Sequence, residues 1–480
     1  MAIYDVAIVG AGPAGSSLAI RLADQGLDVL LLEKHIFPRD KTCGDLVSPK
    51  GLTKLDALGC FEPINQRSYL SLTNARTALD GKWLSSGRIP ALPDMIDHAH
   101  AIPRIVLDET MFRRAQQNGT HTEEACKVNG LTFDKDRICI CAEQAHRSVE
   151  FHARVIVGAD GPHSVVARQV GLKMTDQRYM QYALRAYCHG WPMRESVMLF
   201  EEEFFPGFGW VFPVSDGLAN VGVGLVAESS KKFGLDLNRF FDRLVRRLIH
   251  WAAEEGWHIE VEKPKGWPIK TYGGAHCNFF ERGLLIGEAG CFVDPMNGEG
   301  IPLALESAEL AAETISVAFN QGNFSHEILS QYEQSWRSAF DQDLRISDLV
   351  VSMIRNRYLS KLWIAMLKLS CKTADSDPGY AWKMGGILAG TIPIREGLEP
   401  EVMLSPFLQA MRDRANPFTA SYLHLPQAIG RAIEFGLWEM STLAELARDS
   451  DWLINWCSEV AEKQKLVVAN QHTADYGFSI

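Results

Sequence analysis

IYDVAIVGAGPAG, residues 3–15, is the stretch from which the fold of this chain is predicted. Its first eight residues are mostly apolar and rich in β-branched side chains, which is typical of a buried parallel strand. A helical pattern follows at 14–25, and DVLLLE at 28–33 predicts a second strand that ends in an acid. This order of strand, glycine-rich turn, helix and strand predicts the start of a βαβ unit.

The glycines of this turn match the pattern G-x-G-x-x-G that binds a dinucleotide. Gly10 allows a tight turn, Gly12 lets a pyrophosphate approach the backbone, and Gly15 lets helix and strand pack closely. Glu33 lies 23 residues after Gly10, where a carboxylate accepts both ribose hydroxyls. This acid repels a 2′-phosphate, so FAD or NAD is favoured over NADP. The predicted cofactor-binding residues of this segment are Gly10, Gly12, Pro13, Ala14, Gly15, Glu33 and Lys34.

Later segments predict an α/β fold, α+β overall, in which separated pieces of chain build a Rossmann-like nucleotide domain. ARVIVGA at 153–159 and GLLIG at 283–287 predict two more buried strands, whereas 178–226 suggests an antiparallel sheet. The pattern turns helical from about 303 onward. We therefore predict a nucleotide domain from 1–75, 100–175 and 270–340, a substrate domain from 76–99 and 176–269, and a helical region at 341–480.

Composition excludes several classes of function. The 480 residues carry a formal charge of −11, which argues against a general affinity for nucleic acid or anionic lipid. The sequence contains no run of about 18 apolar residues, so no membrane span is predicted, and its N-terminus lacks the features of a signal peptide. We therefore expect a cytoplasmic protein. Ten cysteines are scattered without a C-x-x-C pair, although Cys139 and Cys141 are predicted to share one face of a strand. Their spacing predicts neither a disulfide framework nor a metal site.

Two further motifs show which dinucleotide is favoured. GADGPHSVVAR at 158–168 resembles the Asp-Gly motif of FAD-dependent hydroxylases, and LLIGEAGCFVDPMNGEGI at 284–301 resembles their second FAD fingerprint. The resemblance implies FAD as the cofactor. The sequence departs from the second FAD fingerprint at one position, where Glu288 replaces the usual aspartate. PRIVLDETMFRRA at 103–115 is similar to the family helix whose arginine, here Arg104, lies near the flavin. The implied cofactor-binding residues are Arg104, Asp160, Gly161, Gly287, Glu288, Pro295, Gly298, Glu299, Gly300 and Ile301.

Two other stretches resemble the geranylgeranyl reductase family, which belongs to the same superfamily as the FAD-dependent hydroxylases. FPRDKTCGDLVSP at 37–49 is similar to the family signature, and FFPGFGWVFPV at 204–214 to its substrate motif, with Phe208 in place of a tyrosine. The resemblance implies an enzyme that saturates C=C bonds of a polyprenyl substrate by hydride transfer from flavin N5. It implies that Cys43, Trp210, Phe208 and Phe212 are catalytic, and that Arg39, Cys43 and Gly44 contact the cofactor.

Other interpretations stay open at this point. A cysteine is usually a buried apolar residue, and aromatic residues are enriched in strands for packing alone. A flavin monooxygenase or halogenase, acting through a flavin C4a-peroxide on a small hydrophobic or aromatic substrate, is the main alternative. A third is a flavoprotein that only binds or transfers electrons. The electron donor is expected to be NAD(P)H or a reduced carrier protein, such as ferredoxin or a partner flavin reductase.

The helical tail suggests one more interaction. Residues 346–370 mix apolar residues with Arg355, Arg357, Lys361 and Lys368, the pattern of a basic amphipathic helix. Such a helix lies on a membrane surface or packs against its own domain. Peripheral membrane contact is therefore an expectation, and the pattern predicts no oligomeric state.

Overall fold

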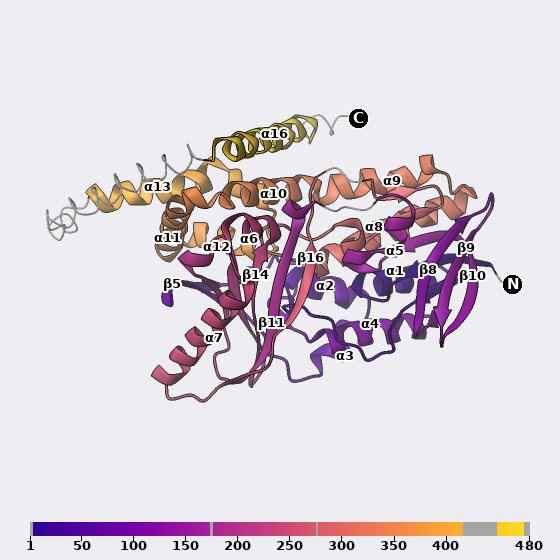
Figure 1. Cartoon of the computed structure of the whole chain (residues 1–480), viewed down its shortest axis with the longest axis horizontal. Coiled ribbons are helices and arrows are strands. Elements are labelled where there is room, and N and C mark those ends of the chain that lie inside the picture. Colours follow the sequence, from indigo (N-terminus) through magenta and orange to yellow (C-terminus); the bar gives the residue numbers. More distant parts are fainter. Residues whose placement is uncertain (1–2, 173–175, 275–276, 416–448, 475–480) are drawn as a thin grey trace.

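The computed structural model describes residues 3–172, 176–274, 277–415 and 449–474. Two eight-stranded sheets, a small two-stranded sheet and a helical layer make up its fold (Figure 1). The first sheet has eight strands, and its path runs β17-β18-β10-β1-β2-β7, with β8 and β9 added beside β10. Strands β18, β10, β1, β2 and β7 pair in parallel, whereas β9 pairs antiparallel with both β10 and β8. These strands are β1 (Ile3–Val9), β2 (Val29–Leu32), β7 (His121–Glu123), β8 (Cys126–Phe133), β9 (Ile138–Gln144), β10 (Arg147–Gly158), β17 (Phe279–Phe280) and β18 (Gly283–Leu285).

Both faces of the parallel sheet are covered, because alternate residues of β1 enter two different cores. Val6 and Ile8 join the core formed with the helices, whereas Ala7 and Val9 face the core under β8, β9 and α5. The helices of this half are α1 (Pro13–Asp24), α2 (Pro49–Ala57), α3 (Phe61–Asn65), α4 (Arg104–Gln117), α5 (Val165–Gln169), α8 (Ile301–Gln321) and α9 (His326–Trp336). The predicted βαβ start is confirmed, with bounds that differ by about one residue.

The second sheet is mainly antiparallel and follows the order β15-β11-β14-β13-β12-β4-β5, with β16 also paired to β11. Its strands are β4 (Asn74–Leu79), β5 (Lys82–Arg88), β11 (Met180–Trp191), β12 (Ser196–Phe200), β13 (Phe208–Ser215), β14 (Gly217–Val226), β15 (Glu260–Val261) and β16 (Lys265–Lys270). The antiparallel sheet predicted from 178–226 is confirmed by the pairing of β11, β14, β13 and β12, and β4 from the earlier segment adds to it in parallel with β12. Helices α6 (Ala227–Phe233) and α7 (Leu237–Glu254) pack on this sheet, and β3 (Leu46–Val47) pairs with β6 (His100–Ala101).

The C-terminal helices form a layer along one edge of the molecule (Figure 1). They are α10 (Gln342–Ile354), α11 (Ser360–Ser376), α12 (Pro378–Leu388), α13 (Pro400–Ala415) and α16 (Ser450–Ala474). The expected single amphipathic helix at 346–370 is wrong, because the chain breaks between α10 and α11. Asn356 causes the break, since its side-chain oxygen accepts a hydrogen bond from the Tyr358 amide and starts a new turn.

None of the helices within the described ranges is both long and apolar enough to cross a membrane. The predicted helical C-terminal region is observed from α10 onward over the described residues, and part of it, 416–448, lies outside them. The strands of the second sheet come from 74–88 and 180–270. The predicted domain boundaries stay predictions.

Candidate FAD site

A cavity of about 780 Å³ opens where the phosphate loop faces the second sheet. Its walls come from both sheets, from the 39–44 segment and from the loops before α4 and α8. This volume is typical of a site for a large cofactor or ligand. The predicted residues that line the cavity are Gly10, Gly12, Pro13, Ala14, Glu33, Lys34, Arg39, Cys43, Gly44, Arg104, Asp160, Gly161, Trp210, Glu288, Gly298, Gly300 and Ile301.

The phosphate loop has the geometry that its glycines predict. Gly10 has a φ of +100°, and a Cβ there would lie 2.5 Å from the Ala159 carbonyl oxygen, so only glycine fits. Gly15 does not line the cavity, because it packs directly against the Gly10 carbonyl. At Gly12 the nearest atom to an added Cβ is an Arg104 nitrogen at 4.0 Å, which leaves room for a ligand above the loop. The N-terminus of α1 begins here and favours an anion.

The Glu33 carboxylate lies at the end of β2, buried, with its oxygens held in place. The Ala11 amide donates to Oε2 at 3.1 Å and the His35 amide donates to Oε1 at 3.1 Å. Arg39 also reaches Oε2, at 3.3 Å. Backbone donors orient the carboxylate into the cavity, where it can accept ribose hydroxyls.

Arg104 joins the phosphate loop to the Cys43 segment. Its guanidinium forms two hydrogen bonds with Asp108, Nε to Oδ1 at 2.6 Å and an Nη to Oδ2 at 2.8 Å, and both side chains are buried. Arg39 donates to the same Asp108 at 2.8 Å. Burial opposes the charge of Arg104, but Asp108 and the Cys43 thiol, which it contacts, raise its pKa overall. A fixed cation therefore lies between Gly12 and the Cys43 sulfur.

Asp160 and Glu288 supply two more carboxylates. Asp160 accepts a hydrogen bond from the Val165 amide, but its Oδ1 is buried and has no partner in the described part of the chain. Burial raises the pKa of Asp160. Glu288 accepts from Lys41 at 3.0 Å and from the Lys270 amide at 3.1 Å, so its longer side chain is held at both oxygens. Asp160 lines the cavity, and a small rotation of its carboxylate would present the partnerless oxygen to a hydroxyl donor of a bound cofactor.

The three predicted aromatic residues of β13 share one face of the strand but not one cavity. Trp210 lines the large cavity, and its ring stacks at 20° on Phe212, which packs into the core near Gly44. Phe208 instead borders a separate cavity of about 30 Å³, together with Pro295. Gly222 on β14 makes room for the indole, because a Cβ there would lie 2.2 Å from the Trp210 ring.

The loop at 294–301 supports the cavity from the side of α8. Gly298, Gly300 and Ile301 line it, whereas Glu299 turns toward Gly390 and Gly287 packs on Ala14. Burial raises the pKa of Glu299 to about 7.

Sequence reasoning missed a polar network beneath Cys43. Asn220 on β14 accepts from the Trp210 indole at 3.0 Å, and donates to the Cys43 carbonyl at 2.9 Å and to Asp45 at 2.7 Å. The Tyr187 hydroxyl on β11 donates to the same Asp45 oxygen at 2.8 Å. This network fixes the thiol segment and the indole relative to each other. An asparagine within the apolar stretch of β14 was the available signal, because asparagine is rare in strands.

Asp45 gives this network a measurable pH dependence. Burial raises the pKa of Asp45 from 3.8 to about 6, despite hydrogen bonds from Tyr187 and Asn220 that lower it. Because the folded pKa lies above the unfolded one, the native state binds the extra proton and stability falls as pH rises from about 4 to 6. Asp45→Asn keeps an acceptor for both donors and removes the charge. We expect it to raise the free energy of unfolding at about pH 7.5 by up to about 3 kcal/mol, with little change at about pH 4.

Urea unfolding of the flavin-loaded proteins at both pH values measures this difference. Asp216→Asn is the matched control, because its carboxylate is 76% exposed. A variant that is less stable than the parent at neutral pH would show that Asp45 is not an unfavourable buried charge.

The residues of the cavity fit FAD: a glycine loop for the pyrophosphate, a held carboxylate for ribose, and Asp160, whose carboxylate has a buried oxygen without a partner in the described residues. A model of the FAD binding domain family matches residues 3–345. The chain belongs to this family. It is an FAD-dependent oxidoreductase, as the predicted fold and cofactor implied, whereas the contact roles of single residues stay predictions.

Curated relatives of this flavoprotein include proteins with different names. Conditioned medium factor receptor 1 from Dictyostelium discoideum is 28% identical over 434 residues, which are 85% of this chain and 82% of the relative. Menaquinone reductase from Mycolicibacterium smegmatis is 30% identical over 327 residues, 65% of this chain and 76% of that enzyme.

Solved structures show the same fold. A geranylgeranyl bacteriochlorophyll reductase-like protein from Thermoplasma acidophilum superposes with a TM-score of 0.62 at 20% identity, covering 74% of this chain and 88% of that one. The flavin-dependent halogenase CmlS superposes with a TM-score of 0.63 at 22% identity, covering 78% of this chain and 72% of that one. At these identities the likeness establishes the fold and leaves the reaction open.

Proposed function

We propose that this flavoprotein saturates carbon–carbon double bonds in an isoprenoid chain. One observation carries the proposal: the Cys43 thiol segment and the Trp210 indole line the same cavity as the phosphate loop. The similarity to a menaquinone reductase supports it, as does the resemblance of residues 37–49 to the geranylgeranyl reductase signature.

An isolated double bond has no carbonyl to accept charge, so it must gain a proton at one carbon and a hydride at the other. Reduced FAD supplies the hydride when it is bound. In the proposal Cys43 delivers the proton, and its thiolate then regains a proton from water, so the substrate gains two hydrogen atoms. Arg104, which contacts the Cys43 thiol, stabilises the thiolate in between.

Trp210 acts through its ring, because its N–H is already donated to Asn220. An aromatic face beside a developing carbocation contributes about 0.5–2 kcal/mol. The apolar walls of the cavity suit a hydrocarbon and exclude water from the reacting carbons. They are formed by Ala183, Trp210, Ile269, Val293, Ile301 and Ala304.

Anaerobic reoxidation tests the proposed function. The bound flavin is first reduced, and a geranylgeranyl compound or menaquinone is then added in the absence of oxygen. We expect the flavin to be reoxidised and the isoprenoid chain of the product to gain two hydrogen atoms. With menaquinone, the product is analysed after the quinol has been reoxidised in air, because reduction of the quinone ring also adds two hydrogen atoms. If only oxygen reoxidises the flavin, and the product carries an added oxygen or halogen, the protein is a monooxygenase or halogenase.

The electron donor belongs to the same proposal. The cavity is assigned to FAD, and we propose NAD(P)H or a reduced carrier protein as the external reductant. Anaerobic flavin reduction by NADPH, NADH and reduced ferredoxin identifies it, because the physiological class should reduce the flavin fastest.

We also propose that the C-terminal helices contact a membrane surface, from which a polyprenyl substrate would be taken. Leu388, Met403 and Ile454 are each more than half exposed on α12, α13 and α16. We expect the protein to cosediment with vesicles of neutral phosphatidylcholine, because the exposed side chains are apolar. The double variant Met403→Ser, Leu404→Ser should cosediment less. The control Ile249→Ser changes an equally exposed residue on α7. Equal sedimentation of all three proteins would contradict this contact.

A further inference from the structure

The outer face of the β9–β10 hairpin carries four side chains that can bind a metal ion. Cys139 and Cys141 lie two residues apart on β9, and Glu150 and His152 lie two residues apart on β10. The antiparallel register places Cys139 opposite His152 and Cys141 opposite Glu150. Because side chains alternate across a strand, all four project from the same face of the sheet.

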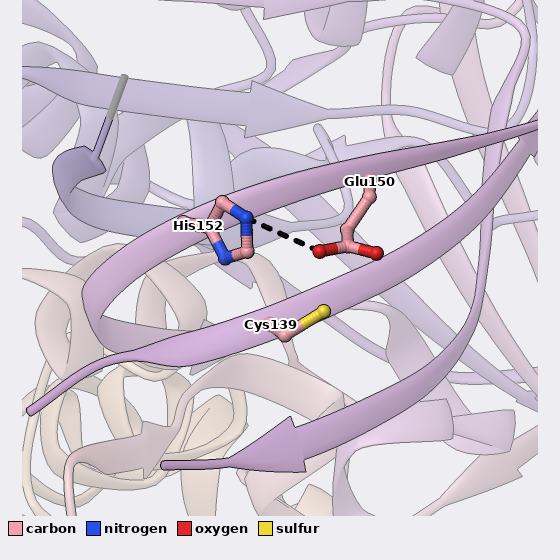
Figure 2. A group of neighbouring side chains, drawn as sticks. All are labelled: Cys139, Glu150 and His152. Carbon is pink, nitrogen blue, oxygen red and sulfur yellow. Dashed lines mark ion pairs between the residues drawn. The ribbon is translucent and has the colours of Figure 1, made fainter. Parts of the chain in front are cut away.

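Three of these side chains already converge (Figure 2). One ligand atom from each of Cys139, Glu150 and His152 lies within 4.8 Å of the other two. His152 Nε2 lies 3.1 Å from Glu150 Oε1. The Cys139 thiol interacts electrostatically with both Glu150 and Cys141, and the strand register places Cys141 directly opposite Glu150, so the fourth side chain lies beside the group of three.

His152 is the most deeply buried member of the group. Its side chain is only 9% exposed, yet its Nδ1 is buried and makes no hydrogen bond within the described ranges. A buried polar atom without a partner costs about 1–3 kcal/mol. Nε2, the nitrogen that faces Glu150, is the one that an ion between the two side chains would contact.

The chemistry of the four side chains selects the ion. Thiolate and imidazole ligands together with one carboxylate are typical of Zn²⁺, whereas Mg²⁺ and Ca²⁺ require oxygen ligands. Ligand atoms at about 2.0–2.3 Å from a tetrahedral zinc ion lie about 3.3–3.8 Å apart, so the side chains would have to move together by about 1 Å. Gly130 of β8 lies opposite Cys141, and no atom lies within 4 Å of where its Cβ would be, so an ion can enter.

We propose that Cys139, Cys141, Glu150 and His152 form a structural zinc site that ties β9 to β10. This inference is independent of the proposed reaction. A bound ion would hold together strands that extend to the FAD cavity. β10 continues to Gly158, and Cys126 of β8, the strand next to β9, lines that cavity. Cysteine spacing alone predicted no metal site, since two of the ligands come from the next strand.

Metal analysis of the flavin-loaded protein tests the site. The protein is incubated with Zn²⁺, dialysed against metal-free buffer and analysed by mass spectrometry for zinc per chain and per flavin. We expect one zinc ion per chain, a loss of at least about tenfold in zinc affinity for Cys139→Ser and for His152→Ala, and a smaller loss for Cys141→Ser. In the Co²⁺ form we expect tetrahedral d–d bands and thiolate charge-transfer absorption in difference spectra.

Two control variants separate this site from general metal binding. His146→Ala changes a histidine in the turn of the same hairpin whose side chain is 99% exposed, and Cys457→Ser changes an exposed cysteine on α16. Both controls should retain zinc, and flavin content and circular dichroism verify that every variant folds. The proposal is overturned if the parent protein holds no zinc, if the ligand variants retain it, or if bound cobalt shows no thiolate absorption.

Discussion

Gly12→Val should give a folded protein that has lost its flavin. The nearest heavy atom to a Cβ at this position is an Arg104 nitrogen, 4.0 Å away, so the protein itself tolerates the side chain. Gly12 has ordinary extended backbone angles, φ −77° and ψ −173°, and valine adopts them without strain. The added methyl groups instead occupy the space through which the pyrophosphate reaches the loop amides.

We expect FAD affinity to fall about 100-fold. Hydrogen bonds to a charged group contribute about 1.5–3 kcal/mol each, and every 1.4 kcal/mol is a factor of ten in affinity. Flavin absorbance per chain after purification, and fluorescence titration of the apoprotein with FAD, measure the change. Gly87→Val is the control, because a Cβ there also meets no atom within 4 Å and the residue lies on β5 away from the cavity. Full flavin content in Gly12→Val would contradict the assigned pyrophosphate position.

Cys43→Ala should reduce the rate of alkene saturation by about 100- to 10,000-fold, the usual contribution of a positioned acid. Flavin content and the rate of flavin reduction by the donor should stay unchanged, since neither step needs the thiol proton. Stopped-flow absorbance under anaerobic conditions separates the two half-reactions. Cys43→Ser should recover part of the rate, because a hydroxyl can still orient a proton next to Arg104.

The control for this variant is Cys457→Ala, which removes an exposed thiol on α16. If Cys43→Ala saturates the substrate within about threefold of the parent rate, Cys43 is not the proton donor, although the reductase assignment stands. If the parent protein itself fails to saturate any isoprenoid substrate, the proposed function fails regardless of Cys43. The two results are therefore distinguishable.

Much of the cofactor site could be predicted because its signals are local in sequence. The turn at Gly10 needs a positive φ, and the acid that ends β2 must follow the loop at a fixed distance. The motifs around Asp160 and Gly298 are likewise contiguous, and residues of both line the cavity. Contiguous motifs can be recognised in a single sequence because a short backbone turn requires particular residues at fixed positions.

The substrate side of the cavity was less predictable. Trp210 lines it, but Phe208 borders another cavity, although the two share a strand face. Asn220 and Tyr187 reach Cys43 and Asp45 across a separation of more than 140 residues, which no local pattern encodes. Asp45 itself has a φ of 65° and is fully buried, a position that follows from packing of the second sheet against the 37–49 segment.

From its order of residues alone, the chain determined a βαβ start, a dinucleotide loop with an acidic ribose partner, and a helical C-terminal region. Short-range periodicity and turn sterics dictate such features before any distant contact forms. Tertiary structure alone decided which side chains share a cavity, how Asp45 is buried, and that Cys139 lies opposite His152. Strand register and the packing of two sheets set those distances, and both depend on contacts between segments far apart in sequence.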